Sequence, residues 1–259
     1  MLSTAHSTAL DFSELQPISL EELISQAAML TRVDRKYVLP RGEVQRIIQG
    51  LDPNTKTLVH NQKAPQAYRS TYFDTPGLTS FYMAARPRRR KFKVRTRSYV
   101  DSKIAFLEVK GTGPRGVTVK ERIPYNFEAA MSDELLPDVI PWLGSKLELA
   151  GMDANTAWDL HPVLWGSYNR STLLMADGVG RATIDTELDW ANHQGAYLDC
   201  PDMAIFETKS GASPSQLDRL LWAYGHRPQK ISKFGTGMAA LDPTLPRNRW
   251  HRIIEQSFK

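Results

Sequence analysis

The sequence lacks the features that mark secreted and membrane-spanning proteins. Cysteine occurs once in 259 residues, at Cys200, so no internal disulfide is available and we expect a reducing compartment. No apolar run approaches the length of a membrane span. The segment 1–5 lacks the basic and hydrophobic regions of a signal peptide. We therefore predict a cytoplasmic protein that does not itself cross a membrane.

Familiar catalytic patterns are scarce as well. Cys200 lies between Asp199 and Pro201, neither of which would activate a thiolate, so a structural role is predicted. The six histidines are scattered without the spacing of metal ligands. The segment 111–113 resembles a phosphate-binding loop, but it lacks the Walker spacing and a following helix, so we expect a turn between strands.

Positive charge is what the chain has in excess, with 33 Lys and Arg against 28 Asp and Glu and a net charge of +5. Between residues 91 and 97 every second residue is a cation. In a strand, Lys91, Lys93, Arg95 and Arg97 share one face. Same-face neighbours lie roughly 7 Å apart, which costs on the order of 2–3 kcal/mol per pair at an effective dielectric constant of about 20. Such a strand either stays solvated at a sheet edge or binds a polyanion. If it binds a polyanion, Lys91 lies either outside the site or at its mouth.

The same alternation recurs in other segments, whose polar faces hold Arg, Lys and Glu rather than Ser, Thr or Gln. An antiparallel sheet that closes with its charged face inward gives a barrel with a cationic lumen, covered outside by helices. In one of these segments, 181–188, Asp185 and Glu187 are candidates either for binding metal or for pairing with arginines of the lumen. The alternating segments are 33–37, 106–110, 118–122, 181–188 and 205–209.

The order of the expected elements indicates an α+β fold. We predict a flexible leader over residues 1–17, one domain over 18–242 and a basic C-terminal tail over 243–259. Strands are expected at 33–37, 68–74, 91–100, 103–110, 116–124, 161–174, 180–192 and 203–209. Helical segments are expected at 19–30, 40–50, 75–84, 126–157, 213–224 and 232–241, the first from a capping box at 19–22.

Motifs in these segments resemble, in the same order, those of VTC domains, which belong to the triphosphate tunnel metalloenzymes. The resemblance implies an eight-stranded antiparallel closed β-barrel with a charged lumen and helices outside. The motifs are Arg35-Lys36-Tyr37, Tyr68 to Thr75, Lys93 to Arg97, Leu107 to Lys110, Val119 to Arg122, Tyr168-Asn169-Arg170, Arg181 to Asp185, Phe206 to Lys209 and Ser232-Lys233-Phe234.

The resemblance also implies an activity, that of a polyphosphate polymerase. Such a domain transfers the terminal phosphoryl group of ATP to a growing polyphosphate chain in the tunnel, with Mn²⁺ or Mg²⁺. Glu207 is the implied metal-binding carboxylate, and Glu108 is a second candidate that otherwise holds neighbouring Arg or Lys side chains. The implied basic lining is Lys36, Arg95, Arg97, Lys110, Lys120, Arg170, Arg181 and Lys233, and the further substrate-binding residues are Lys93, Lys209 and Ser232.

Alternatives remain open. The same fold serves triphosphate hydrolases, and a polyphosphate-binding or sensing module without turnover would need the same cations. The run 86–90 suits nucleic acid, an anionic membrane surface, a phosphate-attracting entrance or a solvated loop. Tryptophans do not alternate with these cations, which disfavours nucleic acid. The membrane helices of eukaryotic relatives are absent, which leaves room for a separate membrane-protein partner; the oligomeric state is not predicted.

Overall fold

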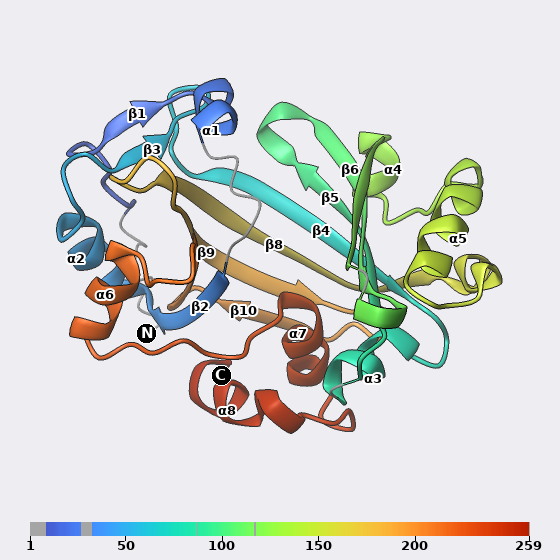
Figure 1. Ribbon diagram of the computed structural model, residues 1–259. Helices are drawn as coiled ribbons and strands as arrows, with labels where there is room; N and C mark the ends of the chain where they lie inside the picture. Colours follow the sequence, from blue (N-terminus) through green and yellow to red (C-terminus); the bar gives the residue numbers. More distant parts are fainter. Residues whose placement is uncertain (1–8, 27–32, 87, 117, 259) are drawn as a thin grey trace. The chain divides into compact units, whose positions relative to one another are not determined.

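The structure, a computed structural model, describes residues 9–26, 33–86, 88–116 and 118–258. The chain forms two compact units. Among the strands labelled in Figure 1, β8 (His161–Leu174) and β9 (Arg181–Ala191) each contribute several residues to both units. The first unit comprises Met1–Gln66, Tyr168–Leu188 and Cys200–Lys230, and the second comprises Ala67–Ser167, Asp189–Asp199 and Ile231–Lys259.

The first unit contains the strand order β2 (Val33–Pro40), β11 (Met203–Ser210), β9 and β8. Antiparallel pairing joins β11 to both β2 and β9. A short strand, β3 (Lys56–Leu58), pairs with β8 and lies parallel to β1 (Gln16–Ile18). The alternating segments at 33–37, 181–188 and 205–209 are therefore strands as predicted.

The second unit contains the order β8, β4, β5, β6 and β7, and β10 (Tyr197–Cys200) pairs with β9. The antiparallel meander expected between residues 91 and 124 is confirmed. The meander consists of β5 (Lys91–Tyr99), β6 (Ile104–Thr112) and β7 (Thr118–Tyr125), and β4 (Gln66–Asp74) pairs with β5.

Short helices accompany the strands in both units. The first unit has α1 (Leu20–Gln26), η1 (Arg41–Glu43), α2 (Val44–Gln49) and α6 (Gln216–Ala223). The second has α3 (Thr79–Ala85), η2 (Val100–Ser102), η3 (Pro114–Gly116), α4 (Phe127–Met131), η4 (Pro137–Val139), α5 (Ile140–Leu149), η5 (Ala154–Asp159), α7 (Lys233–Leu241), η6 (Asn248–Trp250) and α8 (His251–Ser257). No helix in the described part of the chain has the length and apolar character needed to cross a membrane.

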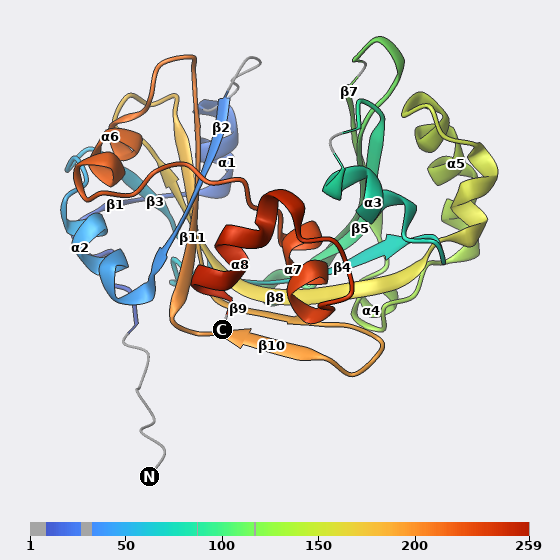
Figure 2. The ribbon, with the colours of Figure 1, turned by 90° about the horizontal axis from the view of Figure 1, so that it is seen from below.

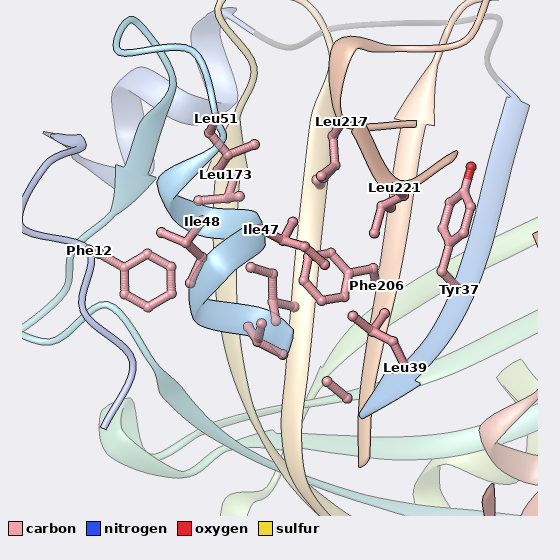
Figure 3. Packing of buried hydrophobic residues seen from close by; sticks show 14 of the residues in the cluster. Phe12, Tyr37, Leu39, Ile47, Ile48, Leu51, Leu173, Phe206, Leu217 and Leu221 are labelled. Atoms are coloured by element: carbon pink, nitrogen blue, oxygen red, sulfur yellow. The ribbon is translucent and has the colours of Figure 1, made fainter. Parts of the chain in front are cut away.

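The core of the first unit lies on the uncharged face of its strands. Tyr37, Ile184 and Phe206 pack there against side chains of α2 and α6 (Figure 3). Because successive side chains of a strand point to opposite faces, this packing fixes Lys36 and Glu207 on the other face.

Helix α6 is anchored to this core by Asp218. The Asp218 carboxylate accepts hydrogen bonds from the hydroxyls of Tyr37 (2.7 Å) and Thr208 (2.6 Å). It also accepts from the backbone N–H of Ser215 at 2.7 Å, while Ser215 Oγ accepts from the backbone N–H of Asp218 at 3.1 Å. The reciprocal bonds between Ser215 and Asp218 form a capping box that fixes the start of α6. The hydrogen bonds from Tyr37 and Thr208 connect the helix to β2 and β11.

The core of the second unit lies on the uncharged face of β5 and β6. Val94, Leu107 and Val109 are buried there with Leu143 and Leu147 of α5, which packs beside β6 and β7 (Figure 2). The same alternation places the cations of β5 and β6 on the opposite face.

Parts of the predicted leader and of the predicted tail pack against the core. Phe12 and Leu15 are buried in the first unit's core, while residues 1–8 and 27–32 lie outside the described part, so the division into leader, domain and tail stays a prediction. The tail contains η6 and α8, and Trp250 and Ile254 are buried. In both segments the few apolar residues are surrounded by polar residues in the sequence, yet they pack against a core in the structure.

Closure of the barrel is not confirmed. The strand order runs from β2 to β7 without returning to β2 in the part of the chain that the structure describes. The antiparallel sheet with helices is therefore established, and the eight-stranded closed form stays a prediction.

Candidate active site

Glu207 lies at the centre of a charged group in the first unit. On the sheet, Glu207 is opposite Lys36 of β2 and opposite Thr183 of β9. Its carboxylate is 2.8 Å from Lys209 Nζ and 3.5 Å from Lys36 Nζ. Both lysines were predicted from sequence to bind phosphate, and the structure brings them to the same carboxylate.

The cations around Glu207 determine its protonation. Burial alone raises the pKa of Glu207, but the ammonium groups of Lys36 and Lys209, with a further contribution from Arg170, outweigh burial and hold this pKa well below its usual range. Glu207 is therefore ionised at neutral pH, as a metal-binding carboxylate must be.

Two arginines complete the group on β8 and β9. Arg170 binds Asp185 through two parallel hydrogen bonds of 2.6 and 2.8 Å, and Asp185 is buried. Arg181 lies opposite Lys209 on the sheet and donates to the backbone carbonyl of Leu23 at 2.6 Å. Asp185 thus orients an arginine, the second of the two roles considered from sequence. The first basic cluster consists of Lys36, Arg170, Arg181, Glu207 and Lys209.

A row of three lysines crosses the second unit. Lys93 of β5 lies directly opposite Lys110 of β6, and Lys110 lies directly opposite Lys120 of β7. Side chains of directly opposite residues have Cβ atoms about 5 Å apart, and like charges in these positions destabilise a sheet. Lys110 and Lys120 are exposed and Lys93 is half-buried. The row therefore concentrates positive charge where an anion can reach it.

The next row holds arginines around Glu108. Arg95 donates to Glu108 through Nε and a terminal nitrogen at 2.8 and 2.6 Å, and Arg97 lies 3.7 Å from the same carboxylate. Burial raises the pKa of Glu108, but these two arginines outweigh burial and lower it. These contacts are those of a residue that holds arginines in position, and a role of Glu108 as a metal ligand stays a prediction.

Lys93 is held by α7 and by two aromatic rings. Its Nζ lies 3.3 Å from Ser232 Oγ, 5.8 Å from the Tyr72 ring centre and 5.4 Å from that of Phe234. Ser232 Oγ also accepts from the backbone N–H of Gly235 at 3.2 Å and so caps α7. Lys233, the first residue of α7, is partly exposed. The second basic cluster consists of Lys93, Arg95, Arg97, Glu108, Lys110, Lys120 and Ser232, and Lys233 stays a predicted member.

Sequence reasoning missed two contributors to the second basic cluster. Tyr72 lies opposite Arg95 and donates no charge, yet its ring faces both Lys93 and Arg95. Arg122 lies opposite Glu108, with its guanidinium 4.5 Å from the Phe106 ring centre. Arg122 shares a face of β7 with Lys120, and this spacing could have identified Arg122 from the sequence. The position of Tyr72 could not be identified in this way, because it depends on the register of the strands.

Two buried hydroxyls lie on the charged faces. Thr183 Oγ1, on the residue opposite Glu207, and Ser70 Oγ, on the residue opposite Arg97, make no hydrogen bond within the described residues. Buried hydroxyls are normally satisfied. Each hydroxyl is thus available to an oxygen-rich ligand or to water.

The residues present fit a divalent metal in one arrangement. No group of three His, Cys, Asp or Glu side chains gathers within the described residues. Mg²⁺ commonly binds through one or two carboxylates with substrate phosphates and water as the other ligands. Glu207, ionised and beside the Thr183 hydroxyl, suits the role of a single protein ligand.

Comparison with known proteins places the chain among others of this fold. A candidate adenylyl cyclase from Hippeastrum with a dominant triphosphatase activity aligns with a TM-score of 0.51 and 13% identity, over 85% of this chain and 100% of its own. A candidate adenylate cyclase from Bacillus halodurans aligns with a TM-score of 0.49 and 14% identity, over 78% and 95%. The likeness to the Hippeastrum protein shows a shared fold. No curated protein matches the sequence. The model of the VTC domain matches residues 31–242, and the chain therefore belongs to the VTC domain family.

Proposed function

We propose that the protein is a metal-dependent polyphosphate polymerase that transfers the terminal phosphoryl group of ATP to a growing polyphosphate chain. The observation that carries the proposal is the row Lys93, Lys110 and Lys120 on adjacent strands. Three ammonium groups on adjacent strands present several points of positive charge, which suits a ligand with several linked phosphates better than a single phosphate. Membership of the VTC domain family supports the same activity.

The side chains of both clusters suit phosphoryl transfer. The reaction passes through a loose transition state, so the protein mainly positions the reactants and stabilises charge. Arg95 and Arg97 present guanidinium forks that bind two oxygens at once, while lysines supply point charges. The acceptor phosphate is already anionic and needs no general base. Mn²⁺ or Mg²⁺, when bound, supplies Lewis-acid stabilisation of phosphate oxygens, and Glu207 is the residue that would hold it.

Further parts of the prediction belong to this proposal. The family resemblance implies that the strands close into an eight-stranded barrel whose lumen is the tunnel. A cytoplasmic location, a membrane-protein partner and a single domain over 18–242 are proposed with it.

A triphosphate hydrolase is the second candidate. The Hippeastrum protein with the same fold has a dominant triphosphatase activity. Hydrolysis differs from polymerisation only in whether water or a phosphate attacks, and the cations described above suit both. A polyphosphate-binding module without turnover would not require the ionised carboxylate of Glu207.

The test is incubation of the purified protein with ATP and Mn²⁺, followed by a gel stained for polyphosphate and an assay for ADP. Polymer with matching ADP release supports the proposal. Free phosphate without polymer contradicts it in favour of the hydrolase. Neither product, with tight binding of polyphosphate, contradicts both enzymes and favours a binding module. A reaction with a chelator in place of Mn²⁺ is the control.

A further inference from the structure

A groove of about 600 Å³ lies on the second unit between α3 and the start of β5. Its lining includes Tyr82 and Met83 of α3, both half-buried. Arginines supply its charge, and all of them are exposed. These arginines are Arg86, Arg88, Arg89 and Arg90, and we call the site the arginine groove.

The arginine groove differs from the two basic clusters in its charge balance. In the clusters, carboxylates pair with the cations, as Glu108 does with Arg95 and Asp185 with Arg170. The groove is lined by no carboxylate, and its arginines form no ion pair within the described residues. Several unneutralised guanidinium groups around one concave site repel one another unless an anion lies between them.

The number of arginines indicates the kind of anion. One phosphate group engages one or two guanidinium forks, so four arginines exceed what a single phosphate can use. A chain of linked phosphates presents an acceptor to each arginine. The groove is open to solvent, so the phosphates of a lipid surface could also reach its arginines, and binding to anionic vesicles distinguishes that source in the test below.

The groove is joined in sequence to the second basic cluster. Arg90 directly precedes Lys91, the first residue of β5, and Lys93 of the lysine row follows on the same strand. A polymer held in the groove is thereby kept at a high effective concentration on the unit that carries the row.

We propose that the arginine groove is a second binding site for polyphosphate, separate from the lysine row, that retains the growing polymer between additions. The proposal rests on the polymerase activity proposed above. Loss of the groove then shortens the product without slowing the first additions, because the residues around the reacting phosphates are unchanged.

The test uses the double variant Arg88→Ala/Arg89→Ala. Arg86 and Arg90 are left intact because the Arg86 guanidinium lies 5.2 Å from the Tyr82 ring centre and the Arg90 stem lies close to Gly151. The matched control is Arg252→Ala/Lys230→Ala, which removes two exposed cations elsewhere. Fluorescence anisotropy with labelled long-chain polyphosphate and with labelled tripolyphosphate measures binding, and the product gel measures length.

We expect the double variant to bind long polyphosphate roughly five- to thirtyfold more weakly than the control, since each exposed ion pair contributes up to about 1 kcal/mol. Tripolyphosphate binding and initial ADP release should stay unchanged, and the product should be shorter. Equal binding of long polyphosphate by both variants overturns the proposal. Selective loss of binding to single-stranded nucleic acid, ATP or anionic vesicles also overturns it, because the groove would then serve another anion.

The two proposals fail in different ways. If the protein makes no polymer, anisotropy still shows whether the groove binds polyphosphate. If polymer is made with the same length and affinity in both double variants, the groove proposal fails and the polymerase stands.

Discussion

In the first unit, Glu207 is the carboxylate that pairs with two lysines and that is proposed to bind the metal. Two lysine ammonium groups within 3.5 Å keep it ionised although its side chain is only 17% exposed. An ionised carboxylate beside cations that are proposed to bind phosphate has an energetic cost for anion binding, because it repels the ligand. Its presence favours a catalytic role over simple anion capture.

Replacing Glu207 by Gln should separate the two roles. The amide keeps the size of the side chain but removes the charge that a divalent metal needs, so we expect turnover of ATP to fall by about 100-fold or more. Polyphosphate binding, measured by calorimetry without metal, should be unchanged or tighter because a repulsive charge is lost. The control is Glu43→Gln, which alters a half-exposed carboxylate paired with His226. Turnover equal to that of the control would remove Glu207 from the mechanism.

Asp218 supports the first unit through its ionised form. Burial raises the pKa of Asp218, but hydrogen bonds from Thr208, Tyr37 and Ser215 outweigh burial and lower this pKa below its ordinary value of 3.8. The unfolded chain therefore binds a proton at a higher pH than the folded chain does. The resulting stabilisation is complete above about pH 4 and is lost as the pH falls toward the folded pKa.

The variant Asp218→Asn tests this contribution. We expect the free energy of unfolding at pH 7 to fall by about 1–3 kcal/mol, because hydrogen bonds to a charged acceptor are lost. The difference from the unmodified protein should shrink below about pH 4, as measured by urea unfolding from pH 7 to pH 3. A difference independent of pH would show that packing, not charge, holds α6 in place.

At the scale of elements, alternation of charge predicted β5, β6 and β7 and the face that each cation occupies. It did so because one buried face forces a period of two on the sequence. The three-residue strands β1 and β3 are too short to show a period. The sequence offered pairing with an arginine as one role of Asp185 and of Glu108. Which arginine each carboxylate binds, Arg170 or Arg95, could not be predicted, since it depends on which strands are neighbours and on their register. Helix α8 was missed because charged residues surround the Ile253 and Ile254 that it buries.

The lysine row of β5, β6 and β7 predicts opposite effects on stability and binding. In Lys110→Ala/Lys120→Ala, repulsion across β6 and β7 is removed, so thermal stability should be unchanged or higher. Binding of tripolyphosphate should weaken by about 10- to 100-fold, since charged hydrogen bonds contribute about 1.5 kcal/mol or more each.

Differential scanning fluorimetry and calorimetry on the same preparations measure the two effects, with Lys146→Ala on α5 as the control. Lys146 lies 5.9 Å from the Trp142 ring centre and belongs to α5, which packs on the uncharged face of β5 and β6, opposite the face of the row. Parallel loss of stability and binding would show that the lysines support the sheet rather than a ligand.

At the scale of the whole molecule, basic clusters occur in both units, and the net charge of +5 adds a general attraction for anions. General attraction weakens with salt and involves every exposed cation, whereas a bound ligand protects particular strands. General attraction and specific ligand binding can be separated by measuring the protection of amides in the strands of each unit in the same sample.

Hydrogen exchange with and without tripolyphosphate makes that separation. We expect slower amide exchange in β5, β6 and β7 of the second unit and in β2 and β11 of the first, because a ligand that binds only the folded form stabilises it by about 2.7 kcal/mol at 100 times its Kd. The protection should persist at moderate salt, and α8, which carries no predicted site residue, should show none beyond global stabilisation. Protection confined to the second unit would restrict triphosphate binding to the lysine row and exclude Lys36, Arg170 and Lys209 as ligands. Equal protection everywhere, lost with salt, would reduce both clusters to general electrostatic attraction.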